Sequence, residues 1–274
     1  MRPELLFLDL MKKTLSFTLW DEPEVPLELF IYRCSLPKRI VYRLFSYALR
    51  LFDLQAVKQS NFEDKSRREG MVWPRYAETM IGLKRLDNVQ FCVESIIQND
   101  IEGDLIETGV WRGGATIFMR AVLAAYGIKD RCVFVADSFE GLPVPDETRY
   151  PQDKGDRNYT QSFLKVSKEE VEANFKKYGL LDDQVIFLKG WFKDALPNAP
   201  IEKLSILRLD GDMYESTMDA LVNLYPKLSK GGFCIIDDYE IPSCKKAVDD
   251  YRSRWNIDIP LVKIDWTGVF WQKE

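Results

Sequence analysis

The chain has 274 residues, of which 46% are hydrophobic and 30% charged, enough for one large domain and a sizeable appendage. The formal net charge of −5 argues against a nucleic-acid-binding surface. Histidine is absent, which excludes Ser-His-Asp and Cys-His enzymes and removes the commonest ligand of transition metals.

Cysteine usage and hydropathy predict a reduced, cytoplasmic protein. The odd number of cysteines and the lack of a C-x-x-C pair argue against disulfides and against tetrahedral zinc. The apolar run Leu5–Leu8 is too short for a signal peptide, and Asp9 interrupts it. No apolar run is long enough to span a bilayer, so we expect no membrane contact.

Residues 1–70 differ in pattern from the rest of the chain. Prolines punctuate them, and the segment Arg39–Phe52 has the apolar spacing of an amphipathic helix. We interpret residues 1–70 as a helical N-terminal lid or appendage, and residues 71–274 as the main domain. The alternative for the appendage is a dimerisation arm that has no role at the functional site.

From residue 77 onward, helical and strand patterns alternate. Helices are predicted over Ala77–Gln98, Ala115–Tyr126, Ser167–Tyr178, Ser216–Leu228 and Pro242–Trp255. Strands are predicted over Asp104–Glu107, Val133–Asp137, Gln184–Leu188, Ser205–Asp210, Phe233–Ile236, Leu261–Ile264 and Val269–Gln272. This alternation predicts an α/β fold, a mainly parallel sheet with helices on both faces.

The stretch from Leu105 to Gly114 is the most informative one. A short apolar strand ends in Glu107, a glycine-rich turn follows, and an apolar helix begins. About thirty residues later, a second strand ends in Asp137. This order is typical of an adenosine-binding crevice, in which glycines let the backbone approach the ligand and the acid accepts ribose hydroxyls. The turn lacks the G-x-G-x-x-G pattern of dinucleotide enzymes.

Acidic residues follow two later strands. Asp210 and Asp212 come after one strand, and Asp237 and Asp238 come after the next. Carboxyl ends of neighbouring parallel strands meet at one sheet edge, so Asp210, Asp237 and Asp238 can converge. Converging carboxylates repel unless a cation bridges them, and oxygen ligands favour Mg²⁺, Ca²⁺ or Mn²⁺. The alternative is that these acids only cap the helices that follow them.

The long polar segment from Phe139 to Ser162 carries three prolines and two glycines. Loops of this length inside a compact domain are usually functional or disordered. We interpret it as a loop on the substrate side of the site.

Several motifs together resemble macrocin O-methyltransferase and its relatives. They are Glu107–Gly114, Asp137–Pro143, Gly179–Asp182, Gly190–Phe192, Leu209–Ser216, Gly231–Tyr239 and Ile264–Gly268. The motifs occur in the family's order from about Trp73 to the C-terminus, whereas residues 1–70 match weakly. The resemblance implies an S-adenosylmethionine-dependent and Mg²⁺-dependent O-methyltransferase. It also implies a Rossmann-like, seven-stranded sheet whose last strand is antiparallel.

The resemblance assigns roles to residues of this chain. The implied cofactor-binding residues are Thr79, Met80, Ile81, Glu107, Thr108, Gly109, Val110, Trp111, Asp137, Ser138, Phe139, Gly141, Gly190 and Trp191. The implied metal ligands are Asp210, Asp237 and Asp238, and Asp210 is also the expected general base. Asp212 or a metal-bound water is the alternative base.

The expected acceptor is a hydroxyl of a small molecule, in particular a sugar on a glycosylated natural product in antibiotic biosynthesis. A phenol is the alternative acceptor. A nucleotide-dependent oxidoreductase and a non-catalytic binding protein are the competing functions. Relatives of this family are commonly dimers, so we expect a homodimer. We also expect residues 1–60 to close over the acceptor and to leave the cofactor site alone.

Overall fold

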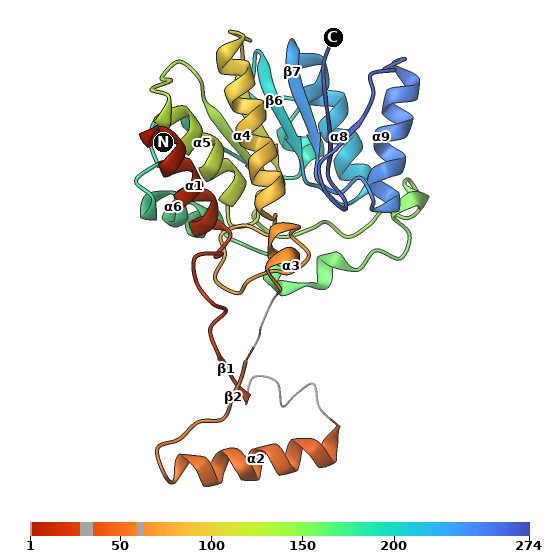
Figure 1. The fold of residues 1–274 in the computed structure, drawn as a ribbon. Helices are drawn as coiled ribbons and strands as arrows, with labels where there is room; N and C mark the ends of the chain where they lie inside the picture. Colours follow the sequence, from red (N-terminus) through yellow and green to blue (C-terminus); the bar gives the residue numbers. More distant parts are fainter. Residues whose placement is uncertain (1, 28–34, 60–62) are drawn as a thin grey trace.

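The computed structural model describes residues 2–27, 35–59 and 63–274. Seven strands form one mixed sheet in the order β5-β4-β3-β6-β7-β9-β8 (Figure 1). They are β3 (Asp104–Thr108), β4 (Val133–Asp137), β5 (Val185–Lys189), β6 (Leu204–Leu209), β7 (Leu228–Ile236), β8 (Val262–Lys263) and β9 (Val269–Gln272). Strand β9 pairs antiparallel with both β7 and β8, whereas β3 to β7 pair in parallel. The predicted seven-stranded fold is confirmed.

Helices cover both faces of the sheet, as the alternating pattern predicts (Figure 1). One face packs against α4 (Leu83–Gln98), α5 (Gly114–Ala125) and α6 (Lys168–Lys177). The other packs against α8 (Tyr214–Leu224) and α9 (Pro242–Arg254). Successive side chains of a strand point to opposite faces, so neighbouring residues enter different cores. Leu105 lies in the first core and Ile106 in the second, which is why these strands read as continuous apolar runs.

After residue 76, three predicted boundaries differ from the structure by more than two residues. Helix α4 begins at Leu83 and not at Ala77, and residues 77–82 run as irregular backbone. In that segment Gly82 lies so close to the backbone of Gly70 that a Cβ atom would be 2.2 Å from its nitrogen. Helix α8 ends at Leu224 because Pro226 enters a short 3₁₀ turn, and β7 then begins at Leu228, earlier than predicted. A short helix, α7 (Phe192–Ala195), was not predicted.

The first helix of the chain belongs to the main domain. Helix α1 (Pro3–Leu15) buries Leu8, Met11 and Leu15 in the core that also holds α4 and α5 (Figure 1). The prediction that residues 1–70 form a single appendage is therefore wrong for α1. The apolar residues Leu8, Met11 and Leu15 recur at helical spacing, which was a usable signal for this helix.

The remainder of the N-terminal region projects from the domain. Strands β1 (Val25–Pro26) and β2 (Val57–Lys58) pair antiparallel, and α2 (Leu36–Arg50) lies beyond them, away from the sheet (Figure 1). Helix α3 (Asp64–Arg68) returns the chain to the domain. Helix α2 confirms the amphipathic helix predicted near Arg39–Phe52. Within the described ranges, no helix is long and apolar enough to cross a membrane.

Candidate functional site

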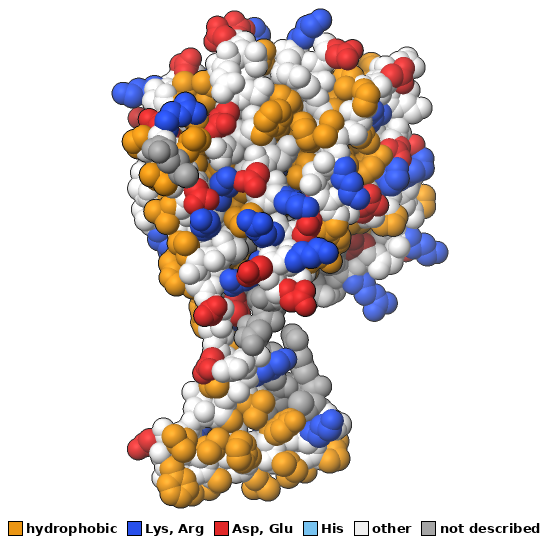
Figure 2. Space-filling view, in the orientation of Figure 1, with side chains coloured by type: hydrophobic (Ala, Val, Ile, Leu, Met, Phe, Trp, Pro, Cys, Tyr) orange, Lys and Arg blue, Asp and Glu red, His pale blue; other side chains and the backbone are white. Residues whose placement is uncertain are grey.

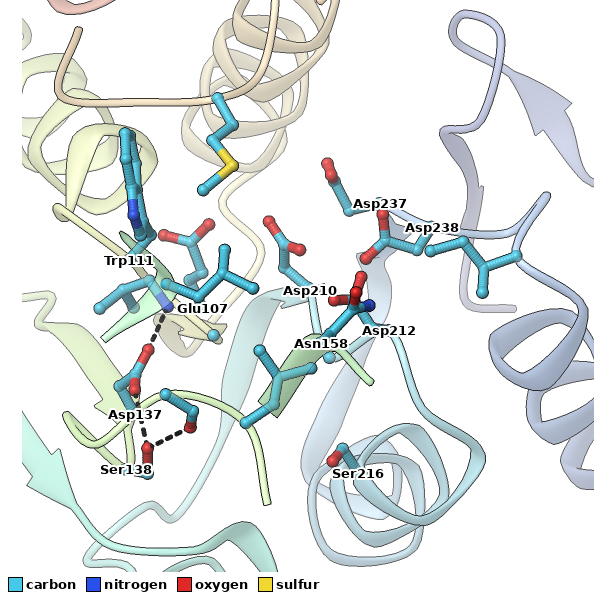
Figure 3. A pocket seen from close by; sticks show the side chains of 18 of the residues that line it. Glu107, Trp111, Asp137, Ser138, Asn158, Asp210, Asp212, Ser216, Asp237 and Asp238 are labelled. Carbon is cyan, nitrogen blue, oxygen red and sulfur yellow. Dashed lines mark hydrogen bonds between the residues drawn. The ribbon is translucent and has the colours of Figure 1, made fainter. Parts of the chain in front are cut away.

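A cavity of about 680 Å³ opens at the carboxyl ends of β3, β4, β6 and β7 (Figure 3). Parallel strands place the residues that follow them at this edge, where open α/β sheets bind ligands. Of the predicted site residues, the cavity is lined by Thr79, Met80, Ile81, Glu107, Gly109, Val110, Trp111, Asp137, Ser138, Gly141, Gly190, Trp191, Asp210, Asp237 and Asp238. The structure thus brings most of the predicted cofactor-binding residues and all three predicted metal ligands to one cavity.

Two predicted cofactor-binding residues do not line the cavity. The side chain of Thr108 is buried, because it points to the opposite sheet face from its neighbour Glu107. Phe139 adopts a φ of 57° and packs in the core with its ring centroid 6.1 Å from that of Phe187. The side chains of Thr108 and Phe139 are therefore buried away from the cavity, unlike those of the other predicted cofactor-binding residues.

Asp137 shapes the glycine turn as well as the cavity (Figure 3). Its carboxylate accepts hydrogen bonds from the backbone N–H groups of Val110 and Phe139, each at 2.8 Å. Burial raises the pKa of Asp137, although these backbone bonds oppose the rise. The Ser138 hydroxyl also donates to the Asp137 carboxylate at 3.4 Å. A carboxylate has about four acceptor positions, so one remains for a ligand hydroxyl.

The turn after β3 needs glycine for a close approach. Gly109 has a φ of +84°, and a Cβ atom there would lie 1.7 Å from the carbonyl oxygen of Asp210. No other residue fits this contact between the turn and the loop after β6. The glycine turn after β3 therefore packs directly against the backbone of the loop that carries Asp210.

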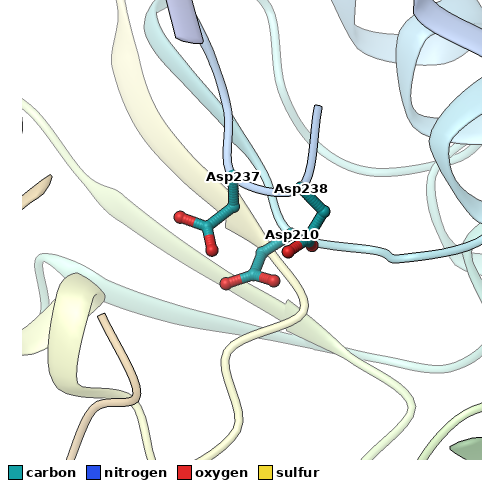
Figure 4. Close-up of side chains that lie close together, drawn as sticks. All are labelled: Asp210, Asp237 and Asp238. Carbon is teal, nitrogen blue, oxygen red and sulfur yellow. The ribbon is translucent and has the colours of Figure 1, made fainter. Parts of the chain in front are cut away.

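Three aspartates meet at the far side of the cavity (Figure 4). Asp210, Asp237 and Asp238 each offer an oxygen, and these oxygens all lie within 4.8 Å of one another. Burial, and then the neighbouring carboxylates, raise the pKa values of Asp210 and Asp238 well above normal. The Oδ2 atom of Asp238 is buried and has no hydrogen-bond partner within the described part of the chain. Crowded carboxylates with an unused oxygen fit a hard divalent cation.

Asp212 completes this acidic group (Figure 3). Burial and the charge of Asp210 raise the pKa of Asp212 to about 6. The alternative that Asp212 caps the following helix fails, because the first N–H groups of α8, those of Tyr214 and Glu215, donate to Asp153 at 2.6 and 3.0 Å. Asp153 belongs to the long loop, which also lines the cavity through Asn158.

Two buried arginines, absent from the sequence-based assignment, hold these acids. Arg208 on β6 is fully buried and donates to Glu107 and Asp237, and to Asp210 at 3.0 Å. Arg85 on α4 donates to the other oxygen of Asp237, and to Asp265 at 2.6 Å. An arginine inside the otherwise uncharged strand Leu204–Leu209 was a usable signal for Arg208. Arg85 lies in a helix with several other charged residues, so the sequence pattern gave no signal for it.

Glu107 lies between the glycine turn and Arg208. Burial raises the pKa of Glu107 to about 8, and the positive charge of Arg208 limits the rise. Its Oε2 atom is buried and has no hydrogen-bond partner among the described residues, although Glu107 lines the cavity. This oxygen is available to a donor group of a bound ligand.

Comparison with known proteins decides the family. The sequence pattern of the macrocin-O-methyltransferase (TylF) family matches residues 4–273. The chain belongs to the macrocin O-methyltransferase family. It is accordingly an O-methyltransferase, which confirms the predicted family and enzyme class and excludes the oxidoreductase and the non-catalytic alternatives.

Three relatives with established names match this chain over nearly the full length of both proteins. Demethyldecarbamoylnovobiocin O-methyltransferase of Streptomyces niveus is 48% identical, over 98% of this chain and 93% of its own length. The 8-demethyl-8-(2,3-dimethoxy-alpha-L-rhamnosyl)-tetracenomycin-C 4'-O-methyltransferase of Streptomyces olivaceus is 48% identical, over 97% and 92%. Mycinamicin III 3''-O-methyltransferase of Micromonospora griseorubida is 47% identical, over 92% and 98%.

Solved structures of methyltransferases share the fold of this family member. The O-methyltransferase NovP superposes with a TM-score of 0.83 at 46% identity, over 98% of this chain and 99% of that chain. The calicheamicin methyltransferase CalS11 superposes with a TM-score of 0.57 at 18% identity, over 69% and 79%, and shows the fold alone. The seven-stranded sheet is thus that of an S-adenosylmethionine-dependent methyltransferase.

Proposed function

We propose that this enzyme transfers a methyl group from S-adenosylmethionine to a sugar hydroxyl on a glycosylated natural product, with Mg²⁺ bound at the aspartates. The observation that carries the proposal is the single cavity, in which the glycine turn faces the cluster of Asp210, Asp237 and Asp238. The acceptor class follows from the relatives, whose names are those of antibiotic O-methyltransferases and in one case include a rhamnosyl group.

The half of the cavity near the glycine turn offers both acidic and apolar groups to the cofactor. Asp137 has an acceptor position left for a ribose hydroxyl, and Glu107 has a free oxygen for the cationic amino group of the methionine part. Trp111, Gly190 and Trp191 line the same half with apolar surface and backbone. Thr79, Met80 and Ile81 lie on the segment before α4 and border the space assigned to the methionine end.

The half of the cavity that holds the aspartates deprotonates the acceptor hydroxyl. A divalent cation, when bound, lowers the pKa of a coordinated hydroxyl and so makes a poor nucleophile reactive near neutral pH. Asp210, Asp237 and Asp238 would hold it. Asp210 takes the hydroxyl proton, a new C–O bond forms, and the methyl–sulfur bond of the sulfonium breaks to leave neutral S-adenosylhomocysteine. Asp212, whose pKa is raised to about 6, is the alternative base.

Orientation supplies much of the remaining acceleration. Holding the hydroxyl oxygen in line with the methyl group can contribute about 7–11 kcal/mol to lowering the barrier. The hydrogen-bonded loop 139–162 and the aromatic residues Trp73, Phe163 and Trp266 border the cavity and would exclude water from the transfer. A cytoplasmic location and a homodimer remain predictions of the sequence.

A methyl-transfer screen tests the proposal. Purified protein is incubated with S-adenosylmethionine, Mg²⁺ and a panel of glycosylated antibiotic precursors, each paired with its aglycone. We expect a mass gain of one methyl group on the glycosides but not on the aglycones. If only a phenolic aglycone is methylated, the acceptor is a phenol and the proposed sugar acceptor is wrong. Full activity in excess EDTA would overturn the metal assignment while leaving the methyltransferase assignment intact.

A further inference from the structure

The turn between β8 and β9 places a large aromatic side chain at the cavity. This turn carries the motif Ile264–Gly268, which in the function proposed above serves only to exclude water. Asp265 and Thr267 of the turn are buried, whereas Trp266 between them is 47% exposed and lines the cavity. A half-exposed tryptophan at the edge of a binding cavity is a surface to which a ligand can bind.

The turn is fixed to the aspartate cluster. Asp265 accepts the backbone N–H of Thr267 at 3.0 Å and pairs with Arg85 at 2.6 Å. The hydroxyl of Thr267 accepts from the same guanidinium and donates to the carbonyl oxygen of Asp237 at 2.8 Å. Because Asp237 is one of the proposed metal ligands, these bonds hold Trp266 beside the place where the acceptor hydroxyl loses its proton.

The indole of Trp266 is also fixed from its other side. Its Nε1–H donates to the carbonyl oxygen of Glu69 at 2.8 Å, and the Glu69 carboxylate pairs with Lys84 at 2.5 Å. The next residue, Gly70, packs so closely on Gly82 that a Cβ atom at Gly70 would lie 2.5 Å from the nitrogen of Gly82. The polar edge of the indole is therefore used within the chain, and what it can offer to a ligand is the apolar surface of its ring.

We propose that the acceptor sugar packs its C–H face on the ring of Trp266 while one of its hydroxyls reaches the aspartates. This contact rests on the proposed function, because it requires a sugar acceptor. A pyranose carries C–H groups on its faces, and their slightly positive hydrogens are attracted to the negative face of an aromatic ring. A ring that is already held in place loses little freedom when the sugar binds. Trp266 thus orients the sugar and selects acceptors that have an accessible C–H face.

Other exposed apolar residues lie away from the aspartates. Figure 2 shows hydrophobic side chains gathered at the projecting end of the molecule, around α2. The described residues that line the cavity begin at Gly70, so α2 lies outside it. Trp73 packs on Phe163 with ring centroids 5.9 Å apart, and the carbonyl oxygen of Phe163 accepts from Trp111 Nε1 at 2.8 Å. These two rings therefore adjoin the glycine turn, whereas Trp266 adjoins the metal ligands.

Steady-state kinetics with the glycosides that are methylated in the screen test this contact. Trp266→Ala should raise the KM for the glycoside about tenfold or more, because the sugar loses the apolar area of the ring. The calorimetric affinity for S-adenosylmethionine and the melting temperature should change little, since the side chain is half exposed and lies on the aspartate side. The control Trp255→Ala, at a 59% exposed residue just after α9 and outside the cavity, should leave this KM unchanged.

Two further variants separate stacking from a structural role. Trp266→Phe keeps an aromatic ring but loses the N–H that binds Glu69, so it should raise the KM less than about threefold. Trp266→Leu keeps apolar bulk without a flat ring and should resemble Trp266→Ala, and it replaces that variant if alanine disturbs the turn. A Phe variant as impaired as the Ala variant would show that Trp266 only anchors the turn.

Methyl α-L-rhamnopyranoside, a sugar without an aglycone, is the second probe. It should inhibit glycoside methylation competitively, and its inhibition constant should rise in Trp266→Ala in parallel with the KM. A raised KM with no inhibition by this sugar, or with an unchanged inhibition constant, would mean that Trp266 packs on the aglycone and that the sugar contact is wrong. An unchanged glycoside KM in Trp266→Ala overturns the contact but leaves the proposed function standing. Methylation of phenols alone by the unmodified enzyme overturns both.

Discussion

Arg208 and Asp237 form a fully buried ion pair between β6 and β7, and the same guanidinium also contacts Glu107 and Asp210. One cation thus holds the carboxylates of both halves of the site. Replacing it leaves buried acids unpaired, a change that costs about 3–5 kcal/mol when one partner of a buried pair is removed. We expect Arg208→Met to lower the free energy of unfolding by that amount in urea titrations with EDTA present. The loss should be smaller at pH 5 than at pH 8, because protonation neutralises the unpaired acids; an equal loss at both would show that packing, not charge, is at stake.

A variant of Asp238 tests metal binding separately from cofactor binding. Its Oδ2 atom has no hydrogen-bond partner among the described residues, so Asp238→Asn disturbs few contacts. We expect this variant to lose calorimetrically detected Mg²⁺ binding and methyl transfer while S-adenosylmethionine affinity changes little. Its melting temperature in EDTA should rise, because one of several repelling charges is removed. The exposed Asp183→Asn is the matched control; unchanged Mg²⁺ binding in Asp238→Asn would move the metal site elsewhere.

Asp137 is expected to contribute strongly to cofactor affinity. Asp137→Ala removes the acceptor for ribose hydroxyls and also frees the N–H groups of Val110 and Phe139 that order the turn. The affinity for S-adenosylmethionine should fall by about 1.5–3 kcal/mol, the range for hydrogen bonds to charged groups. Isothermal titration calorimetry measures this, with the exposed Asp130→Ala as control. Equal affinities of the variant and the unmodified protein would remove Asp137 from the site.

The acidic cluster predicts an unusual dependence of stability on pH. The pKa of Asp212 is raised to about 6 and that of Glu107 to about 8, in both cases chiefly by burial. A carboxyl group with a raised pKa binds its proton more tightly in the folded chain, so its contribution is fully present only below its unfolded pKa of about 4. Stability of the metal-free protein should therefore fall as the pH rises through 6 towards 8. Melting curves in EDTA between pH 5 and 8.5 test this, and Mg²⁺ should restore stability most at the alkaline end; a rise in stability with pH would contradict it.

Helix α1 should be required for folding. Leu8 is fully buried between α1 and the main domain, and Leu8→Ala should cost about 2–5 kcal/mol of stability, the range for such core truncations. Leu10→Ala, in the same helix but 53% exposed, should change stability by no more than about 0.5 kcal/mol. Chemical denaturation compares the two variants. Equal effects at Leu8 and Leu10 would show that α1 is dispensable.

Much of the site could be predicted from the sequence because its signals are local. Alternating strand and helix patterns specify the order of a parallel sheet, and the carboxyl ends of its strands must meet at one edge. Acids at the carboxyl ends of β3, β4, β6 and β7 therefore had to converge, and Glu107, Asp137, Asp210 and Asp237 do. The amphipathic helix α2 was likewise readable from apolar spacing alone.

What remained depends on contacts between residues far apart in the chain, for which a local pattern carries no signal. Arg85 reaches Asp265 across 180 residues, and Asp153 caps a helix 61 residues later. Phe139 packs in the core against Phe187, which lies 48 residues later in the chain. Helix α1 could be assigned to the domain only once α4 and α5 were seen to bury it. The sequence by itself determined which chemistry the strand ends carry, whereas packing decided which buried cations hold those acids in place.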